Sequence, residues 1–444
     1  MKKIVMGIAA VACAASMFAV DFAATTWLTG NLFNYEGASF SEYGDQKITV
    51  KEKGSVKGPS LNKQNQKDTD GLVFSVNGDK AGASVNFFYN SGEEAAVNAR
   101  NVKIWFKPVD QLKVTIGQVG GNFYVDRLTY WKSVVGVNLF EKSNGAYANW
   151  HSYSGYSSRS AVDGWGVLAE FNPISALTIH AGFTPAAGDP IFSSEDKWDA
   201  TDKKTKNTTK MGAWGVGAKY QITDQISAGV SYLDDGFTTA PEMVNNEEKV
   251  VTHNGVKMVR IGGDFGNWGT PYYCMVNATL RFEEYKQKGA DEAALSLAAI
   301  AIDNYWSYKI DALNLQARFP VVLRMTNLNG GRAVDPNYFI YDVKASYQLD
   351  DLGVYCRISS DELALGKIAF GKGEDGVADV KIGDTFCMQI KPGVTFNVGS
   401  CAFDIGAAID ILPKGIAFTE KDPTKAAGKN AVNFSIPFKA EVKF

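Results

Sequence analysis

Three histidines, His151, His180 and His253, are the residues of this 444-residue chain best suited to acid–base or metal chemistry at neutral pH. They lie in separate segments, and none has a cysteine or carboxylate at the spacing of a metal site. The chain contains no Gly-x-Ser-x-Gly elbow and no phosphate-binding loop motif. The segment Gly371 to Gly376 matches a dinucleotide pattern by letters alone, because no helix is expected after it. The sequence therefore predicts no enzyme, no metal site and no cofactor.

Basic side chains form a second group that could act electrostatically. Many segments alternate between polar and apolar residues. At the polar positions of these segments, Lys and Arg outnumber Asp and Glu. The residues that we single out as lining a pore are Lys103, Lys113, Arg260, Arg281, Arg318, Arg324 and Arg357, with Asp342 and Asp404 among the acids. In a water-filled channel such a wall favours anions. Arg281, Arg318, Arg324 and Arg357 would form an anion-facing ladder, unless the charges pair with each other across strands.

Strict alternation shows which elements would carry these side chains. Over the last eleven residues the apolar set is Phe434, Ile436, Phe438, Ala440, Val442 and Phe444, with polar residues or proline between them. A period of two places one class of side chain on each face of a strand. This terminal strand must close a barrel or lie at a sheet edge.

A hairpin template recurs along the chain. The segment from Phe106 to Gly117 matches the segment from Phe171 to Gly182 position for position, and the segment beginning at Tyr220 follows the same spacing. A tighter version runs from Tyr308 to Phe319 and recurs from Tyr347 to Ile358. In each, turn-forming residues separate two stretches of period two.

Short turns therefore alternate with long polar connections, and about 18 strands can be placed. Ascending strands begin near residues 21, 81, 111, 176, 225, 272, 313, 352 and 402, and descending strands end near 77, 107, 172, 221, 265, 310, 349, 398 and 444. Two weak segments, 70–77 and 297–310, leave about 16 as the alternative. Asp291 to Ile302 has the composition of a short helix, whereas its end must be strand in this scheme. The first connection, residues 34–70, is a loop or contains a further hairpin.

Composition agrees with an integral membrane barrel. Beyond the first residues there is no apolar run of about 18 residues, so a membrane-spanning helix is not expected. Only helices and closed barrels satisfy all backbone groups in hydrocarbon, and a mean hydropathy of −0.14 fits strands that are half apolar. An aromatic girdle near the short turns is expected from Phe106, Phe171, Tyr220, Tyr308, Tyr347 and Phe396, although soluble sandwiches also place aromatics at strand ends. The net charge of −3 is not that of a nucleic-acid-binding protein.

The beginning of the sequence predicts export. Lys2 and Lys3 precede an apolar run, so residues 1–19 are read as a signal peptide and residues 20–444 as the mature barrel. Cys13 offers a rival interpretation as a lipid-anchored residue. Of the later cysteines, Cys274, Cys356 and Cys401 fall at apolar positions of their strands and Cys387 falls at a polar position. This pattern favours cysteines that are small outward-facing residues, rather than cysteines that form two disulfides.

The strand ending in Phe438, Ala440, Val442 and Phe444 resembles the signal by which bacterial outer-membrane barrels are recognised by their insertion machinery. Together with the hairpin repeat, it makes the chain similar to outer-membrane β-barrels of the porin type. The resemblance implies an all-β fold, a single transmembrane antiparallel barrel with short periplasmic turns and long external loops. It also implies outer-membrane lipid, the insertion machinery and small hydrophilic solutes as partners, and it admits a homotrimer.

The third external connection, residues 120–163, is rich in aromatics. In porins this loop folds into the lumen, so the resemblance implies a constriction supplied by Tyr124, Asp126, Arg127, Trp131, Glu141, Lys142 and Trp150. The same aromatics could pack the loop on itself, or stack on sugar rings.

Passive diffusion of small hydrophilic solutes across the outer membrane, with a lean toward anions, is the predicted function. The alternatives are a closed barrel acting as a surface adhesin or structural protein, and a hydrophobic-substrate transporter with its N-terminal region in the lumen. A TonB-dependent receptor is disfavoured, because no plug domain is seen ahead of the first predicted strand.

Overall fold

The computed structural model describes residues 19–43, 47–61, 71–90, 96–120, 163–185, 192–199, 204–234, 236–244, 247–253, 255–266, 271–285, 294–324, 337–360, 363–370, 376–380, 386–411 and 432–443. These ranges consist of strands and the turns between them. Within them, no helix has the length and apolar character needed to cross a membrane.

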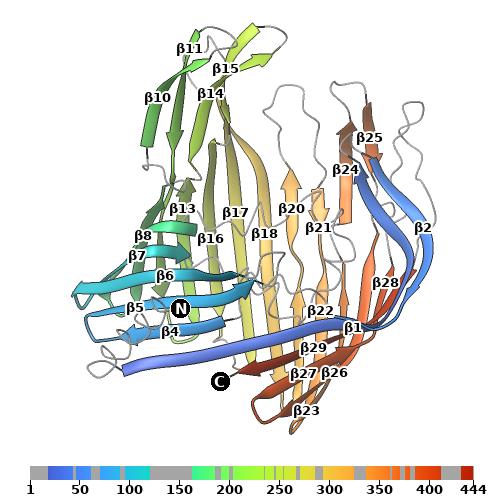
Figure 1. Cartoon of the computed structure of the whole chain (residues 1–444). Helices are drawn as coiled ribbons and strands as arrows, with labels where there is room; N and C mark the ends of the chain where they lie inside the picture. The colour runs from blue at the N-terminus through green and yellow to red at the C-terminus, as the bar shows by residue number, and fades with distance from the viewer. Residues whose placement is uncertain are drawn as a thin grey trace.

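One large antiparallel sheet forms the body of the protein (Figure 1). Its first twelve positions are single strands: β1 (Ala19–Tyr43), β4 (Gly71–Asn77), β5 (Ala81–Asn90), β6 (Ala96–Val109), β7 (Leu112–Gly120), β8 (Asp163–Ile174), β9 (Leu177–Thr184), β12 (Ala213–Gln221), β13 (Ile226–Asp234), β16 (Gly255–Phe265), β17 (Tyr272–Tyr285) and β18 (Ala294–Ile310). The next five are interrupted strands: β19 (Leu313–Arg318) with β20 (Val321–Arg324), β21 (Asn337–Phe339) with β22 (Asp342–Leu349), β23 (Leu352–Ser359) with β24 (Leu363–Phe370), β25 (Gly376–Val380) with β26 (Met388–Val398), and β27 (Cys401–Gly406) with β28 (Ala408–Ile411). The last is β29 (Val432–Lys443).

The sheet closes on itself. β1 pairs with β4 over residues 19–25 and with β29 over residues 25–36, so the last position of the sheet is bonded to the first. In the described part of the chain, the pairings pass through eighteen positions before returning to β1. A closed sheet leaves no unpaired edge.

The turns confirm the repeated hairpin. The predicted strand starts and ends near the short turns agree with the structure to within a few residues: for example, β6 ends at Val109 and β7 begins at Leu112, and β22 ends at Leu349 and β23 begins at Leu352. Both segments that looked weak are strands, β4 and β18, so the ring has eighteen positions and the alternative of sixteen is wrong. The helical interpretation of Asp291 to Ile302 is also wrong from Ala294 onward, because the pairing of β18 with β17 overrides the helix-favouring composition.

Two connections contain strands of their own. The first connection includes the further hairpin that was left open, since β2 (Lys47–Lys57) folds back on the end of β1 and β3 (Ser60–Leu61) pairs beside it. A separate four-stranded sheet is made of β10 (Phe192–Asp199), β11 (Lys204–Met211), β14 (Phe237–Val244) and β15 (Glu247–His253). It stands at the top in Figure 1, at the end opposite the short turns. The segments of this second sheet were expected to be loops.

The two faces of the wall are chemically opposite. In β23, the side chains of Leu352, Val354, Cys356 and Ile358 are exposed, whereas Gly353, Tyr355, Arg357 and Ser359 are buried. The same inversion holds on neighbouring strands, where Ile302, Trp306 and Val343 are exposed and Asp303 and Asp342 are buried. A soluble protein places these classes the other way round. The outer face of the barrel is therefore apolar and its inner face polar.

The expected aromatic girdle is present on the apolar outer face near the short turns. Phe106, Phe171, Tyr220, Tyr308 and Tyr347 are among the exposed large hydrophobic residues. Phe396 stacks on Phe403 of the adjacent strand, with ring centroids 4.8 Å apart. The inner face also has apolar patches, one of which joins Val119, Leu233, Val256 and Met258.

Candidate functional site

The charged side chains gather on the inner wall. Residues of polar parity that are less than one-tenth exposed include Arg260, Asp264, Asp303, Arg318, Asp342, Arg357, Gln389, Lys391 and Asp410. Burying so many charged groups is costly unless each finds a partner. The inner wall is therefore a network of polar contacts, and its geometry decides what the interior can do.

Two arginine–aspartate pairs follow the internal repeat. Arg318 of β19 donates from Nε and Nη2 to the two carboxylate oxygens of Asp303 in β18, at 2.8 Å each. Arg357 of β23 donates in the same way to Asp342 of β22, at 2.9 and 3.1 Å. Both pairs are buried, and in both the arginine follows the aspartate by 15 residues. The tight hairpin repeat thus carries a forked ion pair, the strong geometry of guanidinium and carboxylate.

The two pairs are neighbours. Arg318 lies directly opposite Asp342 in the register of β19 and β22, so acid and base alternate across four adjacent strands. The sequence left open whether the arginines of the predicted ladder face anions or pair with acids across strands. Two of the four, Arg318 and Arg357, are paired with acids. Arg281 has the inner parity of β17, and Arg324 is the last residue of β20, with its side chain outside the described part.

Beyond Arg357 the alternation stops. Lys344, Arg357 and Lys391 lie directly opposite one another on β22, β23 and β26, which places three cations in one row. Like charges in opposing positions are unfavourable. Tyr355 relieves part of this: the Nζ atoms of Lys344 and Lys391 lie 4.8 and 5.6 Å from its ring centroid.

Glycines make room for Tyr355 on the wall. A Cβ built at Gly393 would lie 2.4 Å from the Cζ atom of the Tyr355 ring, and one at Gly406 would lie 2.9 Å from Cε of Lys391. With this space open, the Tyr355 hydroxyl reaches β27 and donates to Asp404 at 2.5 Å. Asp404, one of the predicted pore-lining acids, thereby anchors the tyrosine beside the row of cations.

A second polar cluster lies on β6 to β9, near the short turns. Trp105 of β6 has the inner parity, because its neighbours Ile104 and Phe106 are exposed on the apolar face. Lys107 and Lys113 place their Nζ atoms 5.7 and 5.1 Å from the Trp105 ring centroid. Lys103, another predicted pore-lining residue, shares the parity of Trp105 and is exposed.

Carboxylates near this cluster have closer partners of their own. Glu170 lies opposite Lys113 in the register, yet its Oε2 is 3.2 Å from Nε2 of His180. Asp110, in the turn after β6, forms an ion pair with Lys80 of the neighbouring turn. This contact lowers the pKa of the exposed Asp110 carboxyl below its usual value, with Lys107 adding a smaller effect.

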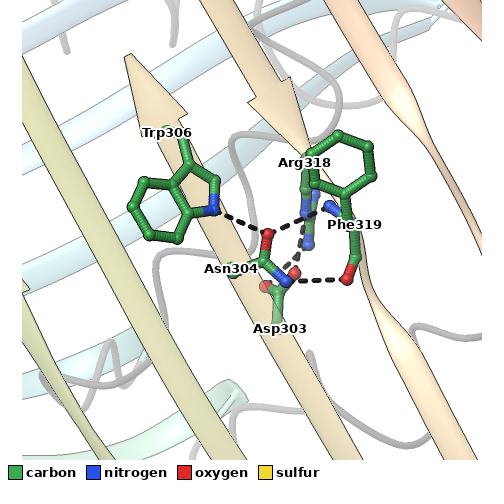
Figure 2. Close-up of polar contacts among 5 residues, drawn as sticks. All are labelled: Asp303, Asn304, Trp306, Arg318 and Phe319. Carbon is green, nitrogen blue, oxygen red and sulfur yellow. Dashed lines mark hydrogen bonds and ion pairs between the residues drawn. The ribbon is translucent and has the colours of Figure 1, made fainter. Parts of the chain in front are cut away.

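A polar contact on the outer face satisfies backbone groups where the strand is interrupted by a proline (Figure 2). Pro320, between β19 and β20, has no N–H to donate. Asn304 of β18 lies on the outer face and bonds the backbone of Phe319: its Oδ1 accepts from the Phe319 N–H at 3.1 Å, and its Nδ2 donates to the Phe319 carbonyl at 2.7 Å. Trp306 donates to the same Oδ1 at 3.0 Å.

Figure 2 shows both sides of this wall segment, since Asp303 binds Arg318 next to the Asn304 contact. Asp303 was not singled out from the sequence, because β18 looked weak. One signal could have found it: Asp264, Asp303 and Asp342 are spaced 39 residues apart, and all three are buried.

The remaining predicted residues are placed as follows. Phe438, Ala440 and Val442 alternate on the apolar face of β29, and Phe444 lies outside the described residues. The proposed constriction residues Tyr124, Asp126, Arg127, Trp131, Glu141, Lys142 and Trp150 also lie outside them, as do residues 1–18 and the segment 371–375. Cys274, Cys356, Cys387 and Cys401 form no disulfide with one another. Among the described residues, no group of three or more His, Cys, Asp or Glu side chains is arranged to hold a metal ion.

Comparison with known proteins gives structural likeness only. No protein-family model and no curated protein matches the sequence. The structure is similar over nearly its whole length to solved outer-membrane proteins. These include the outer-membrane channel DcaP of Acinetobacter baumannii (11% identity, 96% of this chain and 97% of that chain, TM-score 0.43) and OmpT of Vibrio cholerae in a trimer form (13%, 96% and 99%, 0.42). OccK5 of Pseudomonas aeruginosa is similar to the same degree (9%, 95% and 98%, 0.41).

Proposed function

We propose that the protein is an outer-membrane channel that lets small hydrophilic solutes diffuse passively, with a preference for anions. The observation that carries this proposal is the inversion of the wall: a closed ring with an apolar outer face and a charged inner face. Closed barrels satisfy every backbone hydrogen bond in hydrocarbon, and only lipid accepts an outer surface of this kind around the whole ring.

The lean toward anions is supported by the row of three cations. Lys344, Arg357 and Lys391 are accompanied by two acids, Asp342 and Asp404, and the cluster on β6 and β7 adds further lysines. A local excess of positive charge on the wall of a channel lowers the barrier for negative solutes. The paired arginines contribute less than the ladder prediction assumed, because each is held by an aspartate.

The test is single-channel recording of the refolded protein in a planar bilayer with a salt gradient. The proposal expects discrete steps and a reversal potential displaced toward that of chloride. Arg318→Gln and Arg357→Gln should each move the reversal potential toward cation preference, because each change leaves an aspartate without its counter-charge. Steps without anion preference would refute the selectivity, and a silent, folded barrel would refute the channel.

A specific observation favours a second candidate, a barrel that does not conduct and serves as an adhesin or structural protein. On β16 to β29 the inner side chains are tightly packed, with Arg260, Arg357 and Lys391 each 1% exposed. An occluded interior of this kind would give no current. The four-stranded sheet of β10, β11, β14 and β15 would then be the part of the molecule available to a binding partner.

A further inference from the structure

Trp105, Lys107 and Lys113 form a platform on the inner wall near the short turns. The ring of Trp105 packs over Gly82 of β5, where an added Cβ would lie 2.5 Å from the ring atom Cε2. No larger residue fits at Gly82, so the glycine lets the indole lie close against the wall. Trp105 is half-buried and has the inner parity of β6.

The lysines of this platform have no carboxylate in direct contact, although Asp110 and Glu170 attract Lys107 and Lys113 at longer range. Neither Lys107 nor Lys113 forms an ion pair with a carboxylate among the described residues. Glu170 is engaged by His180 at 3.2 Å and Asp110 by Lys80. Elsewhere on the inner wall, Arg318 and Arg357 have carboxylates of their own. Two cations are therefore held at 5.7 and 5.1 Å from an aromatic ring, with an exposed third cation, Lys103, on the same strand.

We propose that this platform binds a small organic anion with a flat unsaturated body, such as an aromatic carboxylate. The ammonium groups would bind the carboxylate through charge-assisted hydrogen bonds, and the indole would contact the flat part of the solute. This proposal builds on the proposed channel function, because it gives the channel a saturable site near the end that carries the short turns. The buried row around Arg357 is less suited to this role, since its arginine already binds Asp342 and is 1% exposed.

The test uses three probes of one charge: benzoate, cyclohexanecarboxylate and acetate. Binding to the detergent-solubilised barrel is measured by equilibrium dialysis, and block of the chloride current is measured in planar bilayers. Benzoate should bind about tenfold more tightly than cyclohexanecarboxylate, which has the same charge and a similar size but is not flat, and acetate should bind most weakly.

Single substitutions test whether benzoate binds at Trp105, Lys107 and Lys113. Trp105→Leu should remove the preference for benzoate over cyclohexanecarboxylate while leaving the lysines in place. Lys107→Gln and Lys113→Gln should each weaken benzoate binding about tenfold. The matched control is Lys309→Gln: Lys309 has the inner parity of β18 and lies beside a short turn, so its change removes the same charge away from the indole. Heat-dependent gel mobility checks that each variant is folded.

Two results would overturn the site: equal affinity of the wild type for benzoate and cyclohexanecarboxylate, or a loss in Lys309→Gln as large as in Lys113→Gln. The outcome is separable from that of the channel. A conducting barrel that does not distinguish the probes refutes the site alone. A barrel that binds benzoate through Trp105 yet carries no current supports the site and refutes the channel.

Discussion

At the scale of the residue, the polar groups described above are explained by their contacts with the adjacent strand. Arg318 and Arg357 are tolerated in the interior because an aspartate on the adjacent strand accepts both arms of each guanidinium. Asn304 is tolerated on the apolar face for a different reason. It replaces the hydrogen bonds that a regular ladder would give to Phe319, next to Pro320.

Replacing Asn304 tests this explanation by the sign of the effect. On hydrophobicity alone, Asn304→Leu should stabilise a barrel in lipid. Because the change leaves the Phe319 N–H and carbonyl without partners in an apolar environment, we expect it to destabilise the barrel by about 2 kcal/mol. Urea-induced unfolding in lipid vesicles measures the difference.

The control is Cys274→Leu, on the outer face of the adjacent strand β17, where the replaced thiol is free. This change should be neutral or stabilising. If Asn304→Leu behaved like Cys274→Leu, the backbone of Phe319 would not depend on the asparagine.

At the scale of the element, the tight hairpins share one turn geometry. Asp311 and Asp350 occupy the same place in the two copies of the repeat, and both have positive φ, 48° and 44°. The turn between β26 and β27 has Gly399 at that place, with φ 59°. A left-handed conformation is unfavourable for residues with a Cβ, so the aspartates hold the turn at some cost that glycine avoids.

Asp350→Gly should therefore stabilise the barrel, by about 0.5–1 kcal/mol, and Asp350→Val should destabilise it by a similar or larger amount. The matched control is Asp351→Gly, at the next turn position, where φ is not positive and added flexibility should lower stability. Equilibrium unfolding of the three variants decides the point. A stabilising Asp351→Gly together with a destabilising Asp350→Gly would contradict the turn geometry.

At the scale of the whole molecule, the apolar face of the sheet lies on the outside of the barrel and the polar face on the inside. Cys356 is exposed on the outer face of β23, whereas Cys387, immediately before β26, is buried. These two cysteines thus report on different environments.

This arrangement predicts the result of site-specific labelling. In a variant that keeps Cys356 alone, a fluorophore on its thiol should be quenched strongly by brominated lipid after insertion into vesicles. In a variant that keeps Cys387 alone, the thiol should stay unreactive until the barrel unfolds, because it is fully buried. Fluorescence of Cys356 that is insensitive to brominated lipid would argue against a lipid-facing outer wall.

The strands of the ring and the short turns between them could be predicted from the sequence alone. Period two, turn residues and the repeated hairpin are local signals, and they act within a few residues of one another. The helix-favouring composition of residues 294–302 shows where local signals fail, because pairing with β17 overrides it. The second sheet above the barrel was also missed, since its strands lie in polar segments without strong alternation.

Which charged side chains contact one another could not be predicted, because these contacts depend on how the strands pair. A shift of one residue in strand register would move every side chain to the other face, so neither the Arg318–Asp303 pair nor the Asn304 contact with Phe319 can be read from one strand. The same holds for Lys107 and Lys113 over Trp105, which depend on the space at Gly82 of the next strand. The class of wall could be predicted from the sequence because patterning is local, whereas the chemistry of the wall could not, because contacts across strands depend on register.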